Sequence, residues 1–376
     1  MSPARHRAML TGVKTPRRSP LTTLLAAPAG LALALTAGLS AQADPPSPDG
    51  AASAQANDTS YVALGDSFSA GTGTRASTDD CYRSPYGYPA LIANAQGLDL
   101  DYQACSGATT ADVLNNQVGA LSPQTDLVTM TIGGNDLGFA DVITECALPG
   151  WLSNCTGAIN GGLSVLRTQL PARYDAVLGA IDSGAPSADV RIGGYPLLFN
   201  GKDCNLLTFF SGSEMTRLNA ATHELNTLVQ QKTTGAGHTF VDPRGAFAGH
   251  AVCDNVEWIN GLSWPIVESF HPNRAGNVGY AEVFWPGTAG AATSSMPADA
   301  ATSRAARVQA EADAVLAMDL DSRANLRAAA GAGISPATIT DLVQRLDSAD
   351  AEVVTAALEE LSVLDERYEA RHGARG

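Results

Sequence analysis

Residues 61–73, YVALGDSFSAGTG, join a short apolar run to a turn of glycine, serine and other small residues. The run from Tyr61 to Leu64 is too short for a helix and ends at Gly65, which is typical of a buried strand in a parallel sheet. Ligands of open α/β sheets bind where the strands end, so Ser67 is expected to face a substrate. Taken alone, Gly-Asp-Ser is equally compatible with an ordinary capped turn, and the rest of the chain has to decide.

The first 43 residues have the pattern of a secretory signal peptide. Basic residues precede an apolar run from Leu21 to Leu39, which closes with Ala41-Gln42-Ala43. A membrane anchor is the alternative, and Pro28 and Gly30 disfavour it. We therefore expect removal of residues 1–43, a flexible leader over residues 44–59, and a secreted protein without stable membrane insertion.

Charge and cysteine content narrow the class of protein further. The formal net charge of −15 argues against nucleic acid as a partner. An even number of cysteines in an exported chain favours disulfides, and no cysteine or histidine spacing resembles a metal site. Many pairings are possible, and pairing of sequence neighbours is the simplest: Cys81 with Cys105, Cys146 with Cys155, and Cys204 with Cys253.

Strand patterns alternate with helix patterns over residues 60–287. The expected strands are Tyr61–Leu64, Leu98–Ala104, Asp126–Ile132, Val190–Pro196 and Thr239–Asp242. The expected helices are Pro85–Ala95, Ala111–Gln117, Gly162–Ser183 with a kink or break at Pro171, one opened by a Ser211/Glu214 capping box, and Ala275–Phe284. This alternation predicts a three-layer α/β domain with a parallel sheet.

The composition changes after the α/β domain. Residues 288–303 are rich in Ala, Ser, Gly and Pro and are interpreted as a linker. Residues 304–376 are Ala-rich and charged, with apolar residues at helical spacing. They predict two or three helices that form a small C-terminal appendage of unknown role.

A nucleophilic serine needs a base and a set of oxyanion donors. Of the six histidines, His6 and His372 lie in the signal and the tail, and His223, His238 and His250 suit surface or capping roles. His271 differs because it precedes Pro272 at the start of the last helix of the α/β domain, which would hold its ring over a cleft.

Four ordered blocks carry a resemblance to a known family: Gly65-Asp66-Ser67, Gly107, Gly133-Gly134-Asn135-Asp136 and His271-Pro272-Asn273. Over roughly residues 61–286 the chain resembles the GDSL, or SGNH, hydrolases. Cys81-Tyr82-Arg83-Ser84 and the three successive cysteine pairs resemble the secreted bacterial lipases and esterases of that family. The resemblance implies the three-layer SGNH fold and three disulfides.

The resemblance also assigns roles. It makes Ser67 the nucleophile and His271 the general base, with the N–H groups of Ser67 and Gly107 and the amide of Asn135 as oxyanion donors. It implies two-step acyl transfer to water through an acyl-Ser67 ester. We also expect a monomer that needs no metal and no cofactor.

Position 268 departs from the family's commonest pattern, which has an aspartate three residues before the histidine. Glu268 is one methylene longer than an aspartate, so its carboxylate cannot simply take the same place beside Nδ1. We expect the main-chain carbonyl of Glu268 to orient His271, with the Glu268 side chain secondary.

Three functions are compatible with these observations. The leading one is a secreted serine ester hydrolase, a lipase or esterase that acts on small-molecule or lipid acyl esters. Its acyl groove is expected from Leu197, Leu198, Phe199, Leu206, Leu207, Phe209 and Phe210. The alternatives are deacetylation of a cell-wall or plant polysaccharide, and a non-catalytic exported binding protein that uses the same scaffold.

Overall fold

A computed structural model of the protein describes residues 59–205, 208–295 and 304–372. Its centre is a parallel sheet of five strands in the order β2-β1-β3-β4-β5. The strands are β1 (Ser60–Gly65), β2 (Asp99–Tyr102), β3 (Leu127–Thr131), β4 (Asp189–Gly193) and β5 (Thr239–Val241). The predicted parallel α/β sheet is therefore confirmed. The signal peptide and the leader lie outside the described residues.

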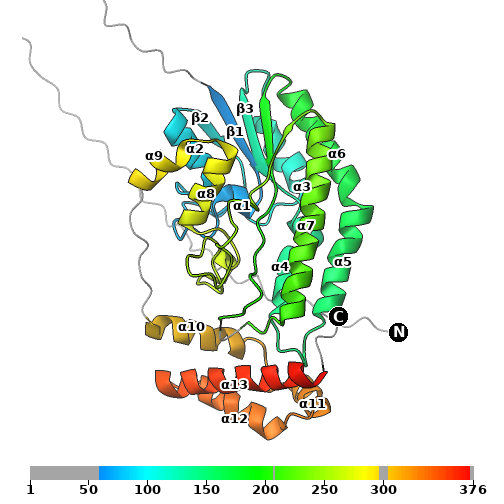
Figure 1. The fold of residues 1–376 in the computed structure, drawn as a ribbon, viewed down its shortest axis with the longest axis vertical. Helices are drawn as coiled ribbons and strands as arrows, with labels where there is room; N and C mark the ends of the chain where they lie inside the picture. Colours follow the sequence, from blue (N-terminus) through cyan, green and yellow to red (C-terminus); the bar gives the residue numbers. More distant parts are fainter. Residues whose placement is uncertain (1–58, 206–207, 296–303, 373–376) are drawn as a thin grey trace, which may run out of the picture. The chain divides into compact units, whose positions relative to one another are not determined.

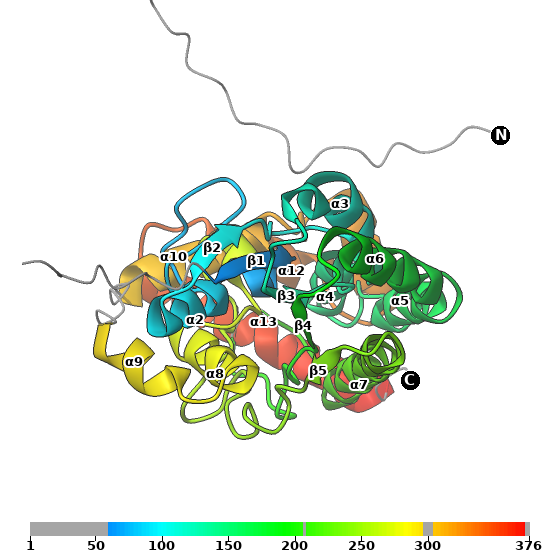
Figure 2. The same cartoon turned by 90° about the horizontal axis from the view of Figure 1, so that it is seen from above.

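Helices cover both faces of the sheet and make the three layers (Figures 1 and 2). One face carries α2 (Tyr88–Gln96), α8 (Arg274–Phe284) and α9 (Thr288–Ser295). The other carries α3 (Thr110–Asp112), α5 (Cys155–Thr168), α6 (Leu170–Gly184) and α7 (Gly212–Gly235). Short helices follow β1 and β3: α1 (Ser67–Ala70) and α4 (Phe139–Cys146).

Local signals place several of these boundaries. The long helix expected at 162–183 is broken, because α5 ends at Thr168 and Pro171 lies in the first turn of α6. The capping box of α7 forms as expected: Ser211 Oγ accepts from the Glu214 N–H at 3.3 Å, and the Glu214 carboxylate accepts from the Ser211 N–H at 2.9 Å.

The sheet holds the main hydrophobic core. β3 is buried along its whole length and β1 from Tyr61 to Gly65, whereas the edge strand β2 alternates between exposed and half-buried residues. In β1 and β3, Gly65 pairs in register with Thr131, so the two strands end level with each other. The loops after these strands therefore start at the same edge of the sheet.

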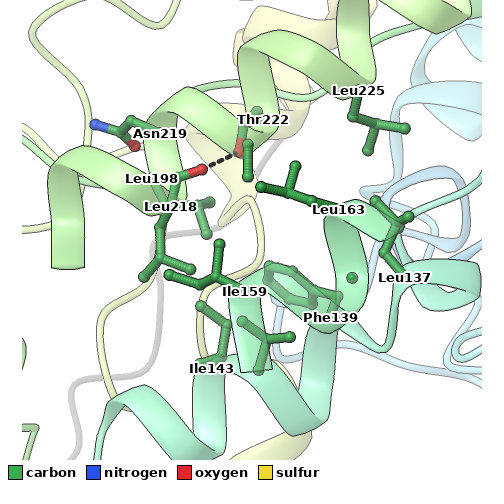
Figure 3. Close-up of a pocket in the computed structure, with 14 residues that line it drawn as sticks. Leu137, Phe139, Ile143, Ile159, Leu163, Leu198, Leu218, Asn219, Thr222 and Leu225 are labelled. Carbon is green, nitrogen blue, oxygen red and sulfur yellow. Dashed lines mark hydrogen bonds between the residues drawn. The ribbon is translucent and has the colours of Figure 1, made fainter. Parts of the chain in front are cut away.

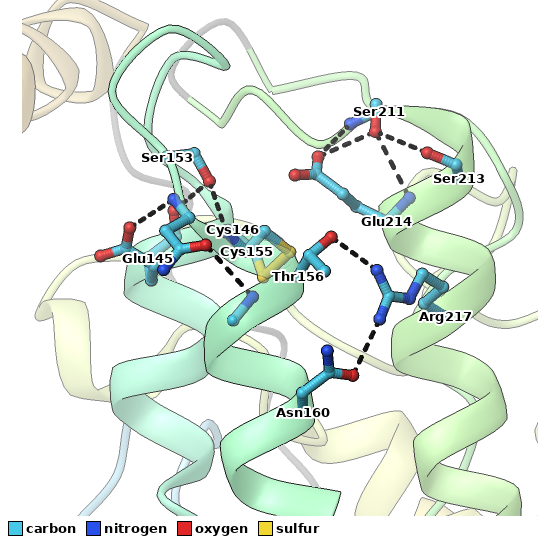
Figure 4. Close-up of a disulfide and its surroundings, with 12 residues drawn as sticks. Glu145, Cys146, Ser153, Cys155, Thr156, Asn160, Ser211, Ser213, Glu214 and Arg217 are labelled. Carbon is cyan, nitrogen blue, oxygen red and sulfur yellow. Dashed lines mark hydrogen bonds between the residues drawn. A yellow bond between two sulfur atoms is a disulfide. The ribbon is translucent and has the colours of Figure 1, made fainter. Parts of the chain in front are cut away.

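All three disulfides join neighbouring cysteines, as predicted. The bonds are Cys81–Cys105, Cys146–Cys155 and Cys204–Cys253. Cys146 is the last residue of α4 and Cys155 the first of α5, so their disulfide closes the loop between these helices (Figure 4). Glu257 lies near Cys204 and Cys253, but both sulfurs are engaged in the disulfide and offer no thiolate to a metal.

The C-terminal region contains four described helices, more than the two or three expected. They are α10 (Arg304–Leu316), α11 (Arg323–Gly331), α12 (Pro336–Leu346) and α13 (Ala351–His372). Their apolar side chains form a second core that also takes in Trp151 and Phe209. Asp365 of α13 accepts a 2.7 Å hydrogen bond from the N–H of Gly150.

The expected linker at 288–303 is partly wrong. Its first half is the helix α9, which contacts α2 and α8, and Thr288 is fully buried. Alanine is the strongest helix former and is also common in linkers, so the Ala-rich composition of this segment did not separate the two. Within the described part of the chain, no helix is both long and apolar enough to span a membrane.

Candidate active site

Ser67 stands at the first position of α1, immediately after β1. Asp66 caps this helix, with its Oδ1 accepting the Phe68 N–H at 3.0 Å. Gly65 makes the turn possible because its φ is +121° and a Cβ there would lie 2.3 Å from the Thr131 carbonyl oxygen. The short strand and the glycine together bring the Ser67 hydroxyl to the carboxyl ends of the parallel strands.

His271 faces Ser67 across this edge. Its Nε2 lies 2.7 Å from Ser67 Oγ, although 204 residues separate the two in sequence. Two main-chain hydrogen bonds with Asn260 hold the segment that carries His271. The Asn260 N–H donates to the His271 carbonyl, and the Phe270 N–H donates to the Asn260 carbonyl. The predicted pair of serine and histidine is thus brought within hydrogen-bonding distance.

The group that orients His271 differs from the expectation. Nδ1 lies 2.8 Å from the carbonyl oxygen of Ser269, not of Glu268. Glu268 ends a 3-10 turn (Ile266–Glu268), and its carbonyl instead accepts from Asn260 Nδ2 at 3.2 Å. Its carboxylate accepts the Arg75 N–H at 3.1 Å. A neutral carbonyl therefore faces the ring, as expected, but it belongs to the next residue.

Burial lowers the pKa of His271 to about 4, and the hydrogen bond to the Ser269 carbonyl opposes this shift. The side chain is 8% exposed. At neutral pH the imidazole is therefore uncharged and Nε2 is able to accept a proton from the Ser67 hydroxyl.

The expected oxyanion donors lie on three neighbouring loops. Asn135 Nδ2 donates to the Ala108 carbonyl at 3.0 Å, which fixes the amide and joins its loop to that of Gly107. Gly107 has φ of +84°, and a Cβ at this position would point into open space. The Asp136 carboxylate strengthens the connection between these two loops, because it accepts hydrogen bonds from both the N–H and the hydroxyl of Thr110, at 2.8 and 2.6 Å.

A cleft begins at Ser67 and continues into an apolar pocket. The first part, with about 420 Å³ of empty space, is lined by residues that include Ser67, Asn135 and Tyr195. The second part, with about 570 Å³, lies between α4 and α5 on one side and α7 on the other. The two parts share Gly134, Phe139, Leu198, Thr222 and Leu225.

Figure 3 shows how the helices form the pocket. Ile159 and Leu163 of α5 face Leu218 and Thr222 of α7. Both polar residues of the α7 wall are bonded to the main chain. The Thr222 hydroxyl donates to the Leu218 carbonyl at 3.1 Å, and the Asn219 amide bonds to the N–H and carbonyl of Phe199. The pocket therefore offers an almost wholly hydrocarbon surface.

Comparison with known proteins agrees with this geometry. Residues 63–278 match the GDSL-like Lipase/Acylhydrolase family. The chain belongs to this family. It is a carboxylic ester hydrolase, as its named relatives also indicate.

Two curated relatives are Streptomyces lipases. Lipase 1 of Streptomyces coelicolor is 42% identical over 240 residues, which are 61% of this chain and 88% of the relative. A lipase of Streptomyces rimosus is 40% identical over 223 residues, or 58% of this chain and 82% of the relative.

Two solved structures share the fold of this GDSL hydrolase. The extracellular lipase of Streptomyces rimosus is 39% identical with a TM-score of 0.57, covering 60% of this chain and 97% of its own. Phospholipase A1 of Streptomyces albidoflavus is 41% identical with a TM-score of 0.56, covering 60% and 98%. The comparisons thus cover the α/β domain of the hydrolase.

Most residues of the expected acyl groove of this hydrolase lie away from the cleft. Of the five that the structure describes, only Leu198 lines it. Phe199 and Phe210 pack at tilted and edge-on angles in an aromatic cluster with Phe270, and Phe209 belongs to the second core. Leu197 is not among the lining residues, and residues 206–207 lie outside the described part of the chain. A dense apolar run predicted the core rather than the substrate surface.

The walls of this pocket were not predicted from the sequence, although a signal was present. Val142 and Ile143, and then Ile159 and Leu163, recur at helical spacing on either side of the Cys146–Cys155 loop. The place of Tyr195 in the cleft was also not predicted, because it depends on contacts with residues far away in sequence.

Proposed function

We propose that this protein is a secreted lipase-type enzyme that hydrolyses esters of medium- or long-chain fatty acids through an acyl-Ser67 intermediate. The observation that supports the proposal best is the 2.7 Å contact between Ser67 Oγ and His271 Nε2 at the entrance of an apolar pocket. This arrangement supports a reaction at Ser67 on an ester whose acyl chain occupies the pocket.

In the proposed reaction, Ser67 Oγ attacks the ester carbonyl while its proton passes to His271 Nε2. The Ser269 carbonyl keeps the other proton on Nδ1, so that Nε2 is the free acceptor in the resting enzyme. The negative oxygen receives hydrogen bonds from the N–H groups of Ser67 and Gly107 and from the Asn135 amide. Each such donor typically lowers the barrier by about 3 kcal/mol.

The second half of the reaction reverses these transfers. His271 gives its proton to the departing alcohol, which leaves the acyl group on Ser67. Water then attacks the acyl-enzyme with His271 as base, the acid is released, and the Ser67 hydroxyl is restored. The unused second N–H of Asn135 Nδ2 is the donor proposed for the oxyanion, since Ala108 already takes the first.

The acyl group is proposed to lie in the pocket between α4, α5 and α7. Each methylene moved from water into a hydrocarbon surface contributes about 0.8 kcal/mol, so a long chain would bind more tightly than an acetyl group. The relative named phospholipase A1 shows that one protein of this fold acts on a lipid ester. Lipid acyl esters are therefore the proposed substrates.

Secretion forms part of the proposal. Three disulfides in the α/β domain suit a protein that folds outside the cytosol, and one structural relative is named an extracellular lipase. Mass spectrometry of protein from the culture medium tests this point, with an N-terminus near Asp44 as the expected result.

A panel of p-nitrophenyl esters from acetyl to palmitoyl tests the reaction and the acyl assignment together. We expect kcat/KM to rise with chain length up to at least eight or so carbons, and a serine-directed phosphonate to label Ser67. Hydrolysis of the acetyl ester alone would favour the polysaccharide deacetylase. Absence of both hydrolysis and labelling would favour the non-catalytic binding protein.

A further inference from the structure

The hydroxyl of Tyr195 lies between the two loops that carry the proposed chemistry. It donates a 2.5 Å hydrogen bond to Asp66 Oδ2 and accepts the Gly134 N–H at 3.1 Å. Asp66 is the residue before Ser67, and Gly134 is the residue before Asn135. One side-chain oxygen therefore connects the nucleophile turn after β1 to the oxyanion loop after β3.

Two hydrogen bonds and one ring contact hold Tyr195 in place. The Asn226 side chain of α7, fully buried, accepts the Tyr195 N–H at 2.8 Å and donates to its carbonyl at 2.7 Å. The Tyr195 ring packs edge-on against Phe68, with ring centroids 5.0 Å apart. The side chain is 7% exposed, so the hydroxyl has little access to water as a substitute partner.

Asp66 is equally well fixed on its other oxygen. Oδ1 accepts from the Phe68 N–H at 3.0 Å and from the Thr131 hydroxyl at 2.8 Å. Loss of the Tyr195 hydroxyl would thus leave the capping of α1 in place while removing the link from Asp66 to the Gly134 loop. The effect of the Tyr195 hydroxyl on the Gly134 loop can therefore be tested separately from the capping of α1.

We propose that Tyr195 is a positioning residue that sets the distance between Ser67 and the oxyanion donor Asn135. This inference rests on the proposed function, because it assigns Tyr195 a role in that same reaction. Gly134 has no other hydrogen bond to fix its N–H in the described contacts, and the turn Asn135–Leu137 starts directly after it. Without the Tyr195 hydroxyl, Asn135 keeps its bond to the Ala108 carbonyl, but the Gly134 main chain before it loses its tie to Asp66, so the oxyanion loop shifts relative to the Ser67 turn.

The expected kinetic signature follows from where the donors act. They bond more strongly to the oxyanion of the transition state than to the ester carbonyl, so misplacement lowers kcat and leaves KM nearly unchanged. Misplacement by about 1 Å can cost on the order of a hundredfold in rate. The ring of Tyr195, which lines the cleft, is retained in Tyr195→Phe, so substrate binding is preserved.

Tyr174→Phe is the matched control. Tyr174 is also fully buried, and its hydroxyl donates a 2.7 Å hydrogen bond to the Ile132 carbonyl, close to the same loop. It bonds to neither Asp66 nor Gly134. Both substitutions remove one buried hydroxyl, and both are expected to lower Tm by a few degrees or so.

The experiment measures kcat and KM on a soluble short-chain ester, together with inhibition by an alkyl trifluoromethyl ketone. This ketone adds to the serine and places a negative oxygen among the donors. For Tyr195→Phe we expect kcat lower by about tenfold to a hundredfold, KM within about twofold, and Ki raised in parallel with the loss in kcat. For Tyr174→Phe all three constants should stay within about threefold of wild type.

Equal kinetics of the two variants would overturn the proposal, as would a rise in KM that accounts for the whole loss. An inactive wild type, or an active Ser67→Ala variant, would refute the proposed function instead. If Tyr195→Phe does not fold, 4-aminophenylalanine at position 195 provides the test. Its amine can still donate to Asp66 but accepts poorly from the Gly134 N–H, so we expect kcat to fall about fivefold or more. Wild-type kcat in that variant would contradict the role of Tyr195.

Discussion

The two sides of the Ser67 cleft are built in different ways. The polar side consists of loops at the ends of β1, β3 and β4, joined by hydrogen bonds between residues far apart in sequence, such as those of Tyr195 with Asp66 and Gly134. The apolar side consists of side chains from α4, α5 and α7 with no bonded network among them. The strength of a hydrogen bond depends on the direction between donor and acceptor, whereas apolar packing depends on how well the side chains fill the available volume.

This difference separates the rate of the reaction from the choice of substrate. A change on the polar side alters donors whose placement matters to a fraction of an ångström, so it should act on kcat for every ester. A change on the apolar side alters the space for the acyl chain, so it should act on long esters and spare short ones. The following predictions test this separation, from the largest expected effect to the smallest.

Replacing Ser67 with alanine should reduce hydrolysis of all esters by about three orders of magnitude or more, since among the described residues the Ser67 hydroxyl is the side chain bonded to His271 Nε2. Steady-state kinetics with acetyl and palmitoyl esters should show the same proportional loss. Circular dichroism should show a fold like that of wild type. Turnover near that of wild type would rule out Ser67 as the nucleophile.

Filling the apolar side should change chain-length preference. Leu163 lines the pocket, so Leu163→Trp should lower kcat/KM for long-chain esters by about tenfold to a hundredfold and leave the acetyl ester within about threefold. Ser164→Trp, on the exposed side of the same helix, is the control. An equal loss on acetyl and palmitoyl esters would show that this pocket does not hold the acyl chain.

The pH dependence should reflect burial of His271. Because its pKa is lowered to about 4, kcat/KM on a short ester should stay level from pH 8 to about 5 and fall about tenfold by pH 3. An ordinary histidine would already lose activity near pH 6.5 or so. Near-ultraviolet circular dichroism at each pH checks that the fold persists.

The lowered pKa of His271 also affects the free energy of unfolding. The folded state binds fewer protons than the unfolded state between about pH 4 and the ordinary histidine value of about 6.5. The contribution of neutral His271 is therefore fully present above that value, and is lost as the pH falls through this window. Burial raises the pKa of Asp66 to about 6 and that of Asp365 to about 7, which changes stability in the opposite direction over the same window. Urea unfolding of wild type and His271→Ala at pH 7 and pH 5 therefore isolates the histidine as the change in the difference between the two proteins. A difference that is the same at both pH values would count against a buried neutral His271.

Removing the Glu268 carboxylate should have a small effect. Its carboxylate bonds to the Arg75 N–H while the Ser269 carbonyl faces His271, so Glu268→Ala should lower kcat tenfold or so at most. Glu268→Gln, which keeps an oxygen acceptor, is the matched comparison. A loss of about a thousandfold in the alanine variant would show that the carboxylate completes the site in the working enzyme.

Removal of the C-terminal helices should affect the rate least. A chain that ends after Ser295 keeps α9 and every residue of the proposed site, so turnover of a soluble short ester should stay within about threefold. Its Tm should fall, because Trp151 and Phe209 lose the apolar partners of the second core. A well-folded truncated protein with no turnover would show that α10–α13 contribute to the reaction.

The parts of the site that were predictable follow from local patterns. Gly65 and the short β1 run predict the Ser67 turn, and His271 before Pro272 predicts the start of α8. The acceptor of Nδ1 was placed one residue too early, because the 3-10 turn Ile266–Glu268 directs the Glu268 carbonyl toward Asn260. Tyr195 was not predictable, since its partner Asp66 lies 129 residues away and no local pattern encodes that contact.

The Cys146–Cys155 disulfide spans nine residues and joins the two helices, α4 and α5, that form one side of the pocket. Arg217 of α7 bonds to Thr156 and Asn160 just beyond it, so α5 is held against α7 at the same end (Figure 4). The Cys81–Cys105 disulfide, by contrast, lies two residues before the proposed oxyanion donor Gly107. Loss of the Cys146–Cys155 disulfide alone should therefore weaken discrimination between acyl chains, whereas loss of the Cys81–Cys105 disulfide should lower hydrolysis of every ester, so the two covalent links protect different properties of the enzyme.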